Sequence, residues 1–341
     1  MGALGKHSWI LASAAALAWS ATASADIVSA MIDISQYQDA DTVTKIAKAS
    51  NFELVMHRAT LGADTVDLTY ATSFRKIRNA KLSAGAYHVL YPQSGPNDVA
   101  HSGMNQAHAF LSTIAAACKS GEPVLLALDW ESPSANGLLQ APASAQVATE
   151  FVSEVRSQTG ADVLVYTDGR TLDATKSGIG QVLSKSPLWL AAYHRSLRFD
   201  SDPHTLKYTA GADSIEITIE HRLVEGLAFP VSSDYAPWGT VTFWQFSEGG
   251  DNGQGPGWAP IRLIEPSISP YDTSYFIGTR DAFRSFVANT SWKCDPKVAK
   301  QWANVAPPPV RTPPTPAPAP SPPPAPAAAP PPAPPASTPT P

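Results

Sequence analysis

The alternation of strand-like and helical segments constrains the fold of this chain most. The expected strands are residues 28–33, 52–58, 84–91, 124–129, 162–166, 188–193 and 240–246, and the expected helices are 42–49, 70–81, 99–118 and 144–158. Strands that alternate with helices form parallel sheets covered by those helices. Because no convincing helix separates the last strands, the order predicts an eight-stranded barrel whose final strands lack helices.

Acidic residues stand at the ends of strand-like runs. Asp33 and Asp272 each close a run, and Asp129 and Glu131 end the apolar stretch that starts at Pro123. Alternate side chains on a strand share a face, so Asp129 and Glu131 lie together with Cα atoms roughly 6.5–7 Å apart. Adjacent carboxylates do not both ionise easily, which favours a general acid with a raised pKa. The pair predicts hydrolysis of a glycosidic bond at the C-terminal ends of the strands.

The first 25 residues have the pattern of a secretory signal peptide. Lys6 precedes an apolar stretch from Trp9 to Trp19, and Ala23-Ser24-Ala25 forms a cleavage site that leaves Asp26 as the mature N-terminus. A transmembrane anchor is the alternative, but the apolar stretch is too short and too rich in Ala and Ser to favour it. We therefore expect a secreted or periplasmic protein, cleaved near Ala25, with no membrane span in its mature form.

Residues 306–341 consist almost entirely of Pro, Ala, Ser and Thr, with Arg311 as the only charge. Such a segment cannot bury a core and samples extended polyproline II conformations. We expect a disordered tail after a single catalytic domain at residues 26–296. The tail could hold the protein off a surface, or it could be inert.

Composition excludes several classes of function. The net charge of −5 is evenly spread, without the basic patch that nucleic acid requires. The eight histidines lack zinc-site spacing and there is no C-x-x-C motif, so we expect neither metal nor cofactor. We expect a monomer. Cys118 and Cys294 are a candidate disulfide because thiols in exported chains tend to pair, although two cysteines alone leave the pairing open.

Short motifs follow the strand ends in a fixed order. They are Ile32-Asp33-Ile-Ser35-Gln-Tyr37-Gln38, Val55-Met-His-Arg58-Ala-Thr60-x-Gly62 with Asp67, Ala84-Gly85-Ala86-Tyr87-His88, Leu128-Asp129-Trp-Glu131, Val165-Tyr166-Thr167, Leu188-Trp189-Leu-Ala-Ala-Tyr193, Phe243-Trp244-Gln245-Phe246-Ser247, and Asp272 before Tyr275-Phe276-x-Gly278. Over residues 27–286 the set resembles the N-acetylmuramidases (lysozymes) of glycoside hydrolase family 25. The resemblance implies a (β/α)5β3 TIM-like barrel. It also implies cleavage of the β-1,4 bond between N-acetylmuramic acid and N-acetylglucosamine in bacterial peptidoglycan, with retention and without metal.

The resemblance also implies roles for the four acids. Glu131 matches the general acid/base, which must start neutral, and Asp129 matches its partner, which we expect to stay ionised. Asp129 would either stabilise an oxocarbenium-like charge or orient the substrate's 2-acetamido group, and the sequence leaves both open. Asp33 and Asp272 match acids on the floor of the site, with a structural hydrogen-bonding role as the alternative.

Aromatic side chains near strand ends suit a sugar-binding cleft, because sugars stack on aromatic rings. Packing in the barrel core is the alternative for each ring. His88 follows Tyr87 on a strand and points the other way, which favours a core histidine. The candidate substrate-binding residues are Tyr37, Tyr87, Tyr166, Trp189, Tyr193 and Trp244.

Two features depart from the family pattern. Leu61 stands where family members usually carry an acid, and residues 194–238 form a longer connection than usual. Strict alternation over 214–220 predicts a half-exposed strand there. We expect a hairpin at the rim of the cleft that tunes substrate choice, with decoration as the alternative.

Two other functions compete with the muramidase prediction. Family 18 chitinases carry D-x-x-D-x-D-x-E, but counting back from Glu131 gives Asp129 and then Ala127 and Val124, so this motif fails. A non-catalytic peptidoglycan-binding protein could share the fold. The presence of all four acids disfavours that reading, because a pure binding protein has no need of adjacent carboxylates.

Overall fold

The computed structural model describes residues 24–38, 41–48, 52–135, 138–192, 205–210, 213–219, 235–247 and 272–298. Three predictions therefore lie outside the described residues: the signal peptide up to residue 23, Tyr193 and the Pro-rich tail. Within the described ranges, no helix has both the length and the apolar character needed to cross a bilayer.

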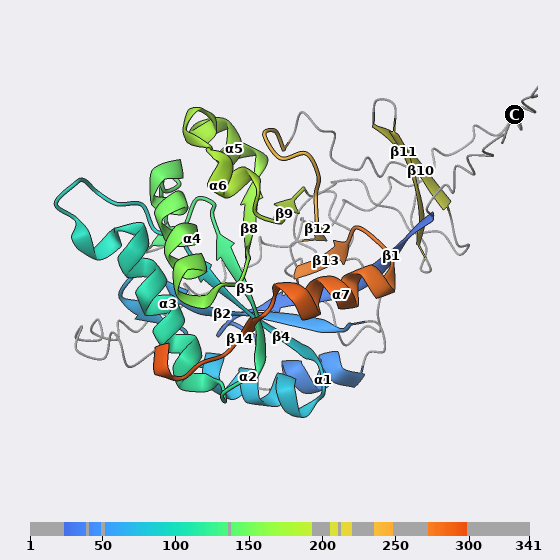
Figure 1. Ribbon diagram of the computed structural model, residues 1–341, viewed down its shortest axis with the longest axis horizontal. Helices are drawn as coiled ribbons and strands as arrows, with labels where there is room; N and C mark the ends of the chain where they lie inside the picture. Colours follow the sequence, from blue (N-terminus) through green and yellow to red (C-terminus); the bar gives the residue numbers. More distant parts are fainter. Residues whose placement is uncertain are drawn as a thin grey trace, which may run out of the picture.

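Eight strands close into a barrel (Figure 1). In spatial order they are β1 (Ser24–Ile34), β2 (Leu54–Leu61), β4 (Ser83–Val89), β5 (Pro123–Asp129), β8 (Val163–Asp168), β9 (Leu188–Ala191), β12 (Phe243–Ser247) and β13 (Asp272–Phe276). Neighbours pair in parallel from β1 round to β12, whereas β13 is antiparallel to both β12 and β1. The predicted (β/α)5β3 barrel is confirmed.

Helices cover the outside of the parallel part. They are α1 (Thr42–Lys48), α2 (Tyr70–Asn79), α3 (Gly103–Ala117), α4 (Ala145–Thr159), α5 (Gly169–Thr175) and α6 (Gln181–Ser184), with α7 (Arg280–Thr290) after the last barrel strand. The expected helix over 99–118 is split into the 3-10 turn η1 (Val99–His101) and α3. Ser102 causes the break, because its backbone is extended and its side chain caps α3 by accepting from the Asn105 N–H.

Alternation along the strands creates two apolar clusters. The inner cluster fills the barrel with residues such as Met56, Leu125 and Phe243. The outer cluster holds the intervening residues, among them Val55 and Leu126, and packs against α2, α3 and α4. Because consecutive residues fall in different clusters, the register of each strand decides which side chain at its end faces into the barrel.

Helix α7 closes the end of the barrel opposite the C-terminal ends of the parallel strands. Phe283 packs edge-on against Phe243, at the start of β12, and against Phe276, at the end of the antiparallel β13. Both strand positions lie at the N-terminal face of the parallel barrel. The interior is therefore filled by aromatic rings at one end and stays open to a site at the other.

A disulfide joins Cys118, at the end of α3, to Cys294, just after β14 (Trp292–Lys293), with a Cα–Cα distance of 6.4 Å. The strand β14 pairs with β5, and the Gly121 N–H donates to the Cys294 carbonyl at 2.8 Å. The bond spans 176 positions of sequence. The disulfide ties the C-terminal segment to the end of α3, and the β14 pairing ties it to β5, the strand that carries Asp129.

Replacing both cysteines by serine should lower the free energy of unfolding by about 2–5 kcal/mol, because the bond restricts a long loop in the unfolded chain. Urea denaturation without reductant measures the change. Adding reductant to the wild type should give a similar loss and should leave the double variant unchanged. Equal midpoints for oxidised wild type and variant would contradict a stabilising role.

The connection between β9 and β12 contains a hairpin of β10 (Thr205–Ala210) and β11 (Asp213–Ile219), so the predicted strand is present. Its position differs from the prediction of a rim element. The strand β11 pairs with β1 at Ser24–Ile27, and Asp33 lies roughly 20 Å further along β1 at the usual strand rise. The described hairpin extends the sheet away from the strand ends that carry the acids (Figure 1), so these two strands are not the predicted rim element; residues 193–204 and 220–234 of the same connection lie outside the described residues.

Candidate active site

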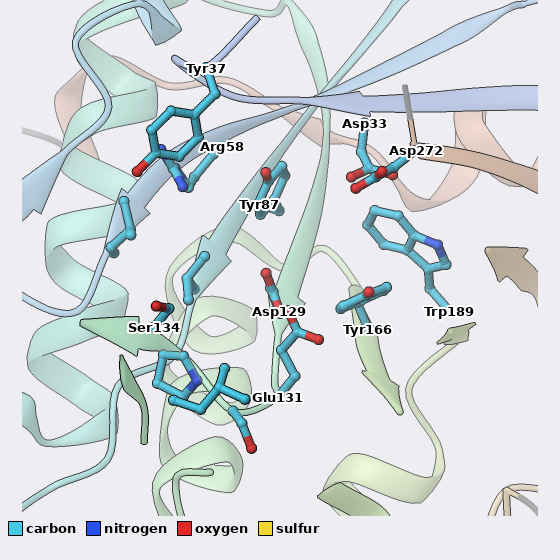
Figure 2. Close-up of a pocket in the computed structure, with 15 residues that line it drawn as sticks. Asp33, Tyr37, Arg58, Tyr87, Asp129, Glu131, Ser134, Tyr166, Trp189 and Asp272 are labelled. Atoms are coloured by element: carbon cyan, nitrogen blue, oxygen red, sulfur yellow. The ribbon is translucent and has the colours of Figure 1, made fainter. Parts of the chain in front are cut away.

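A pocket of about 330 Å³ opens at the C-terminal ends of the parallel strands (Figure 2). Its lining combines four carboxyl groups, one cation, several aromatic rings and a few apolar side chains. These residues are Asp33, Tyr37, Arg58, Leu61, Tyr87, Val89, Asp129, Glu131, Ser132, Pro133, Ser134, Leu139, Tyr166, Trp189 and Asp272.

All four predicted acids line this pocket, although Asp272 reaches it differently from the prediction. Asp33 lies near the end of β1 and Asp129 at the end of β5, whereas Asp272 is the first residue of β13 rather than the last of a strand. Because β13 is antiparallel, its first residue meets the last residues of the parallel strands. Asp33 and Asp272 are directly opposite each other in the β1–β13 pairing.

Asp129 and Glu131 face the pocket while the residue between them does not. Trp130 is fully buried in the outer cluster, and its indole N–H donates to the Ala143 carbonyl at 2.8 Å. This anchor fixes the alternation just beyond the end of β5, so both carboxyl groups project to the same side. Asp129 is only 8 % exposed, and its Oδ1 has no hydrogen-bond partner among the described residues.

Burial raises the pKa of both Asp33 and Asp129 well above the ordinary aspartate value. The next cause is negative charge, from Asp272 for Asp33 and from Glu131 for Asp129. The sequence predicted an ionised Asp129, but its enclosure in the barrel mouth favours the protonated form. Neighbouring carboxyl groups are nevertheless close enough to raise the pKa of Asp33 and of Asp129, as the predicted acid–base chemistry requires.

Gln245 links two walls of the pocket and was missed from the sequence. Its side-chain nitrogen donates to Asp33 Oδ2 at 2.8 Å, and its Oε1 accepts from the Tyr166 hydroxyl at 2.8 Å. The alternation of side chains along β12 could have identified Gln245 as a pocket residue, since Phe243 and Gln245 share the inward face. Applied to this strand, the same alternation turns Trp244 outward.

Trp244 is therefore a correction to the predicted substrate-binding set. It is fully buried in the outer cluster, and its indole N–H donates to the Ala192 carbonyl at 2.9 Å. Trp189 and Tyr166 do line the pocket, with ring centroids 4.7 Å apart. The Trp189 indole N–H donates to Ser274 Oγ at 2.9 Å, so the ring is held in place.

Tyr37 and Arg58 form the opposite end of the pocket (Figure 2). Tyr37 is 57 % exposed, and its ring centroid lies 5.1 Å from the Arg58 guanidinium carbon. Tyr87 lies between the two ends on β4, and burial raises the pKa of its hydroxyl well above the usual value. Arg58 occurs in a motif quoted above, but a single arginine at a strand end does not by itself predict a binding residue.

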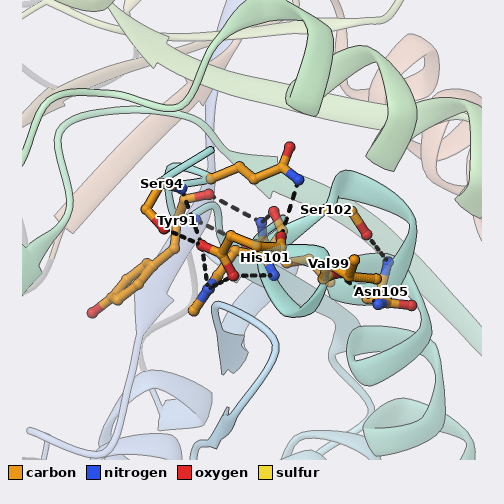
Figure 3. A network of polar contacts seen from close by, with 9 residues as sticks. Tyr91, Ser94, Val99, His101, Ser102 and Asn105 are labelled. Carbon is orange, nitrogen blue, oxygen red and sulfur yellow. Dashed lines mark hydrogen bonds and ion pairs between the residues drawn. The ribbon is translucent and has the colours of Figure 1, made fainter. Parts of the chain in front are cut away.

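The hairpin of β6 (Ser134–Ala135) and β7 (Leu138–Leu139) lines one side of the pocket with Ser134 and Leu139. The connection from β4 to α3 contacts this hairpin through the Tyr91 hydroxyl, which donates to the Ser134 carbonyl at 3.4 Å. Polar contacts hold that connection in shape (Figure 3). Asp98 Oδ2 accepts from the N–H and hydroxyl of Ser94, and the Asp98 carboxylate contacts His101 Nδ1.

His88 is a core histidine, as the alternation of β4 predicts. It is fully buried, contacts Thr60 Oγ1 at 2.7 Å and Gln106 Oε1 at 3.1 Å, and stacks on Phe151. Burial lowers its pKa to about 3, which keeps the ring neutral. Within the described ranges, no group of His, Cys, Asp and Glu side chains has the arrangement to hold a metal ion.

Replacing Asp33 by Asn should raise the free energy of unfolding at neutral pH. The folded state holds a proton that the unfolded chain releases above pH 3.8, so Asp33 destabilises the native state increasingly as the pH rises from 3.8 through its raised folded pKa. Asn removes this cost and keeps an oxygen for Gln245. Urea denaturation at several pH values measures the free energy of unfolding of wild type and variant. The exposed Asp173→Asn variant is the control. A gain in the free energy of unfolding that persists below pH 3.8 would contradict this account.

Comparison with known proteins identifies the family of this chain. The family model described as "Glycosyl hydrolases family 25" matches residues 32–209, which is more than half of the chain. No curated protein sequence matches the chain.

Several solved structures are similar to this chain. A bacterial lysozyme from Streptomyces coelicolor is 20% identical, with 76% of this chain and 96% of that chain covered and a TM-score of 0.47. A muramidase from Acremonium alcalophilum has the same identity and TM-score, with 76% and 97% covered. A family GH25 lysozyme from Aspergillus fumigatus is 21% identical, with 75% and 97% covered and a TM-score of 0.46. With the family model as its basis, the chain belongs to glycosyl hydrolases family 25 and is a glycoside hydrolase.

Proposed function

We propose that this protein is a secreted N-acetylmuramidase that hydrolyses the β-1,4 bond between N-acetylmuramic acid and N-acetylglucosamine in bacterial peptidoglycan. One observation carries the proposal: Asp129 and Glu131 project from the end of one strand into a pocket that also contains Asp33 and Asp272. Membership of glycosyl hydrolases family 25 supports the substrate class, and the similar solved structures include a lysozyme and a muramidase.

Glu131 acts as the general acid/base in this proposal. It first protonates the oxygen that leaves the glycosidic bond, and then removes a proton from the water that releases the product, so the sugar keeps its configuration. Glu131 is half-buried and lines the pocket, whereas Asp129 is enclosed, so a leaving group and water can approach Glu131.

Asp129 responds to the positive charge that develops at the anomeric carbon in the transition state. It either stabilises this charge directly or orients the 2-acetamido group, whose oxygen then acts as an internal nucleophile. An adjacent cationic transition state favours the ionised carboxylate and opposes the effect of burial. The unpartnered Asp129 Oδ1 is a suitable acceptor for an acetamido N–H.

Asp33, Asp272, Tyr166 and Trp189 form the floor and one wall on which the sugar rests. The Gln245 amide holds Asp33 and Tyr166 in fixed orientations, and the fixed Trp189 ring offers a face for sugar stacking. In the same proposal, export removes residues 1–25, residues 26–296 fold as a monomeric catalytic domain, and the Pro-rich tail is not needed for catalysis.

Digestion of purified peptidoglycan, with analysis of the new reducing ends, tests the reaction. Muramic acid reducing ends are expected, and proton NMR of the first product should show the β-anomer if configuration is retained. N-acetylglucosamine ends, or faster cleavage of chitin, would assign another glycosidase activity. Binding without new ends would assign a non-catalytic peptidoglycan-binding protein.

A further inference from the structure

Arg58 is the only cation among the described residues that line the pocket. It lies at the end near Tyr37, while Asp33, Asp272 and Trp189 lie at the other end, with Asp129 between them in Figure 2. The pocket is therefore polarised, with carboxyl groups towards one end and a single positive charge at the other.

The surroundings of Arg58 leave Nη2 of its guanidinium without a hydrogen-bond acceptor among the described residues. Its Nε donates to Asp67 Oδ2 at 3.1 Å, and among the described residues Arg58 forms no other ion pair. The Asp67 carboxylate is buried and also accepts from the Gln36 N–H at 2.9 Å and from the Thr69 N–H at 3.0 Å. Asp67 is thus held by backbone donors and fixes Arg58 through one nitrogen only.

The two terminal nitrogens of Arg58 form a fixed fork. The residue is 7 % exposed, and among the described residues Nη2 has no hydrogen-bond acceptor. The Tyr37 ring covers one face of the guanidinium. A buried cationic donor without an acceptor is unfavourable, and a guanidinium fork matches the two oxygens of a carboxylate or the oxygen of an amide carbonyl.

We infer that Arg58 binds the lactyl carboxyl group of a muramic acid residue and makes the pocket selective for muramyl glycans. The inference rests on the proposed function and names the substituent that is recognised. The lactyl group distinguishes muramic acid from N-acetylglucosamine, and its carbonyl oxygen remains an acceptor when a peptide is attached. Arg58 is the one positive charge in the described lining of the pocket, so its end is the favourable place for an anionic substituent of the glycan.

Calorimetry in a Glu131→Gln background tests the inference, because the ligand then stays intact. The ligands are a peptide-free tetrasaccharide of alternating N-acetylglucosamine and N-acetylmuramic acid, and chitotetraose. Arg58→Gln should weaken binding of the muramyl ligand roughly 10- to 100-fold, as expected for a hydrogen-bonded charge, and should change chitotetraose binding little. Arg58→Lys, which keeps a positive charge beside Asp67 but lacks the guanidinium fork, should bind the muramyl ligand more weakly than wild type and more tightly than Arg58→Gln. Arg284→Gln, an exposed residue of α7, is the matched control.

Equal weakening of both ligands would overturn the inference, because it would assign Arg58 to the shared acetamido group or to support of the pocket. An unchanged affinity for the muramyl ligand would overturn it as well. An Arg58-dependent preference in a protein whose wild type releases no muramic acid ends would support the assignment of Arg58 and refute the proposed reaction. The two hypotheses therefore fail separately.

Discussion

The Glu131→Gln variant should fold normally and lose at least about 10²- to 10⁴-fold in kcat on peptidoglycan, the usual contribution of general acid–base catalysis. Gln has the same shape but cannot donate a proton to the leaving oxygen. Release of reducing ends from purified peptidoglycan measures kcat, and thermal unfolding verifies that the fold is intact.

A matched control for Glu131→Gln is Glu150→Gln on α4, outside the pocket, where the amide oxygen can still accept from the Gly103 N–H. This variant should keep wild-type kcat. A Glu131→Gln enzyme that retains more than about a tenth of wild-type activity would remove Glu131 from the acid/base role, given the size of that contribution.

The Asp129→Asn variant should lose about 10²- to 10³-fold in kcat, as is typical when one preorganised electrostatic group is removed. Asn keeps the volume of Asp129 in its enclosed position but cannot carry the negative charge that opposes an oxocarbenium-like transition state. Initial rates on soluble muramyl oligosaccharides measure the loss. A rate within a few-fold of wild type would rule out Asp129 as the charge partner.

Inhibitor binding separates the two roles of Asp129. A thiazoline analogue of the cyclic oxazolinium intermediate should bind wild type tightly and Asp129→Asn weakly if Asp129 orients the acetamido group. If Asp129 instead stabilises the cation directly, the analogue should bind both proteins equally. Calorimetry at one fixed pH compares them.

Much of the fold could be predicted because each parallel strand is a local signal. Apolar runs, helix-capping residues and the Asp-Trp-Glu triplet act over a few neighbouring positions, so β5 and the two inward carboxyl groups at and just beyond its end follow from alternation alone. Asp272 was placed correctly in the pocket but at the wrong end of its strand. The direction of β13 depends on closure with β1, which no local pattern encodes.

The remaining errors also come from long-range pairing. Trp244 and Gln245 are neighbours in one motif, and only the register of β12 decides which of them enters the barrel. The position of the β10–β11 hairpin depends on pairing of β11 with β1, whereas the sequence showed only that a strand was present. The importance of Arg58 depends on Asp67 engaging a single nitrogen, which is a matter of three-dimensional geometry.

The site forms only when the antiparallel strand β13 pairs with β1 and closes the barrel. Asp33 and Asp272 come from the first and last strands of the barrel and meet only across the β1–β13 seam. A ribosome-bound or truncated chain that lacks β13 therefore carries Asp129 and Glu131 but cannot assemble the four-carboxyl pocket. Contacts between such distant positions form late and slowly in folding. The onset of activity during refolding should therefore report the joining of the two ends of the barrel, and not the formation of its helices.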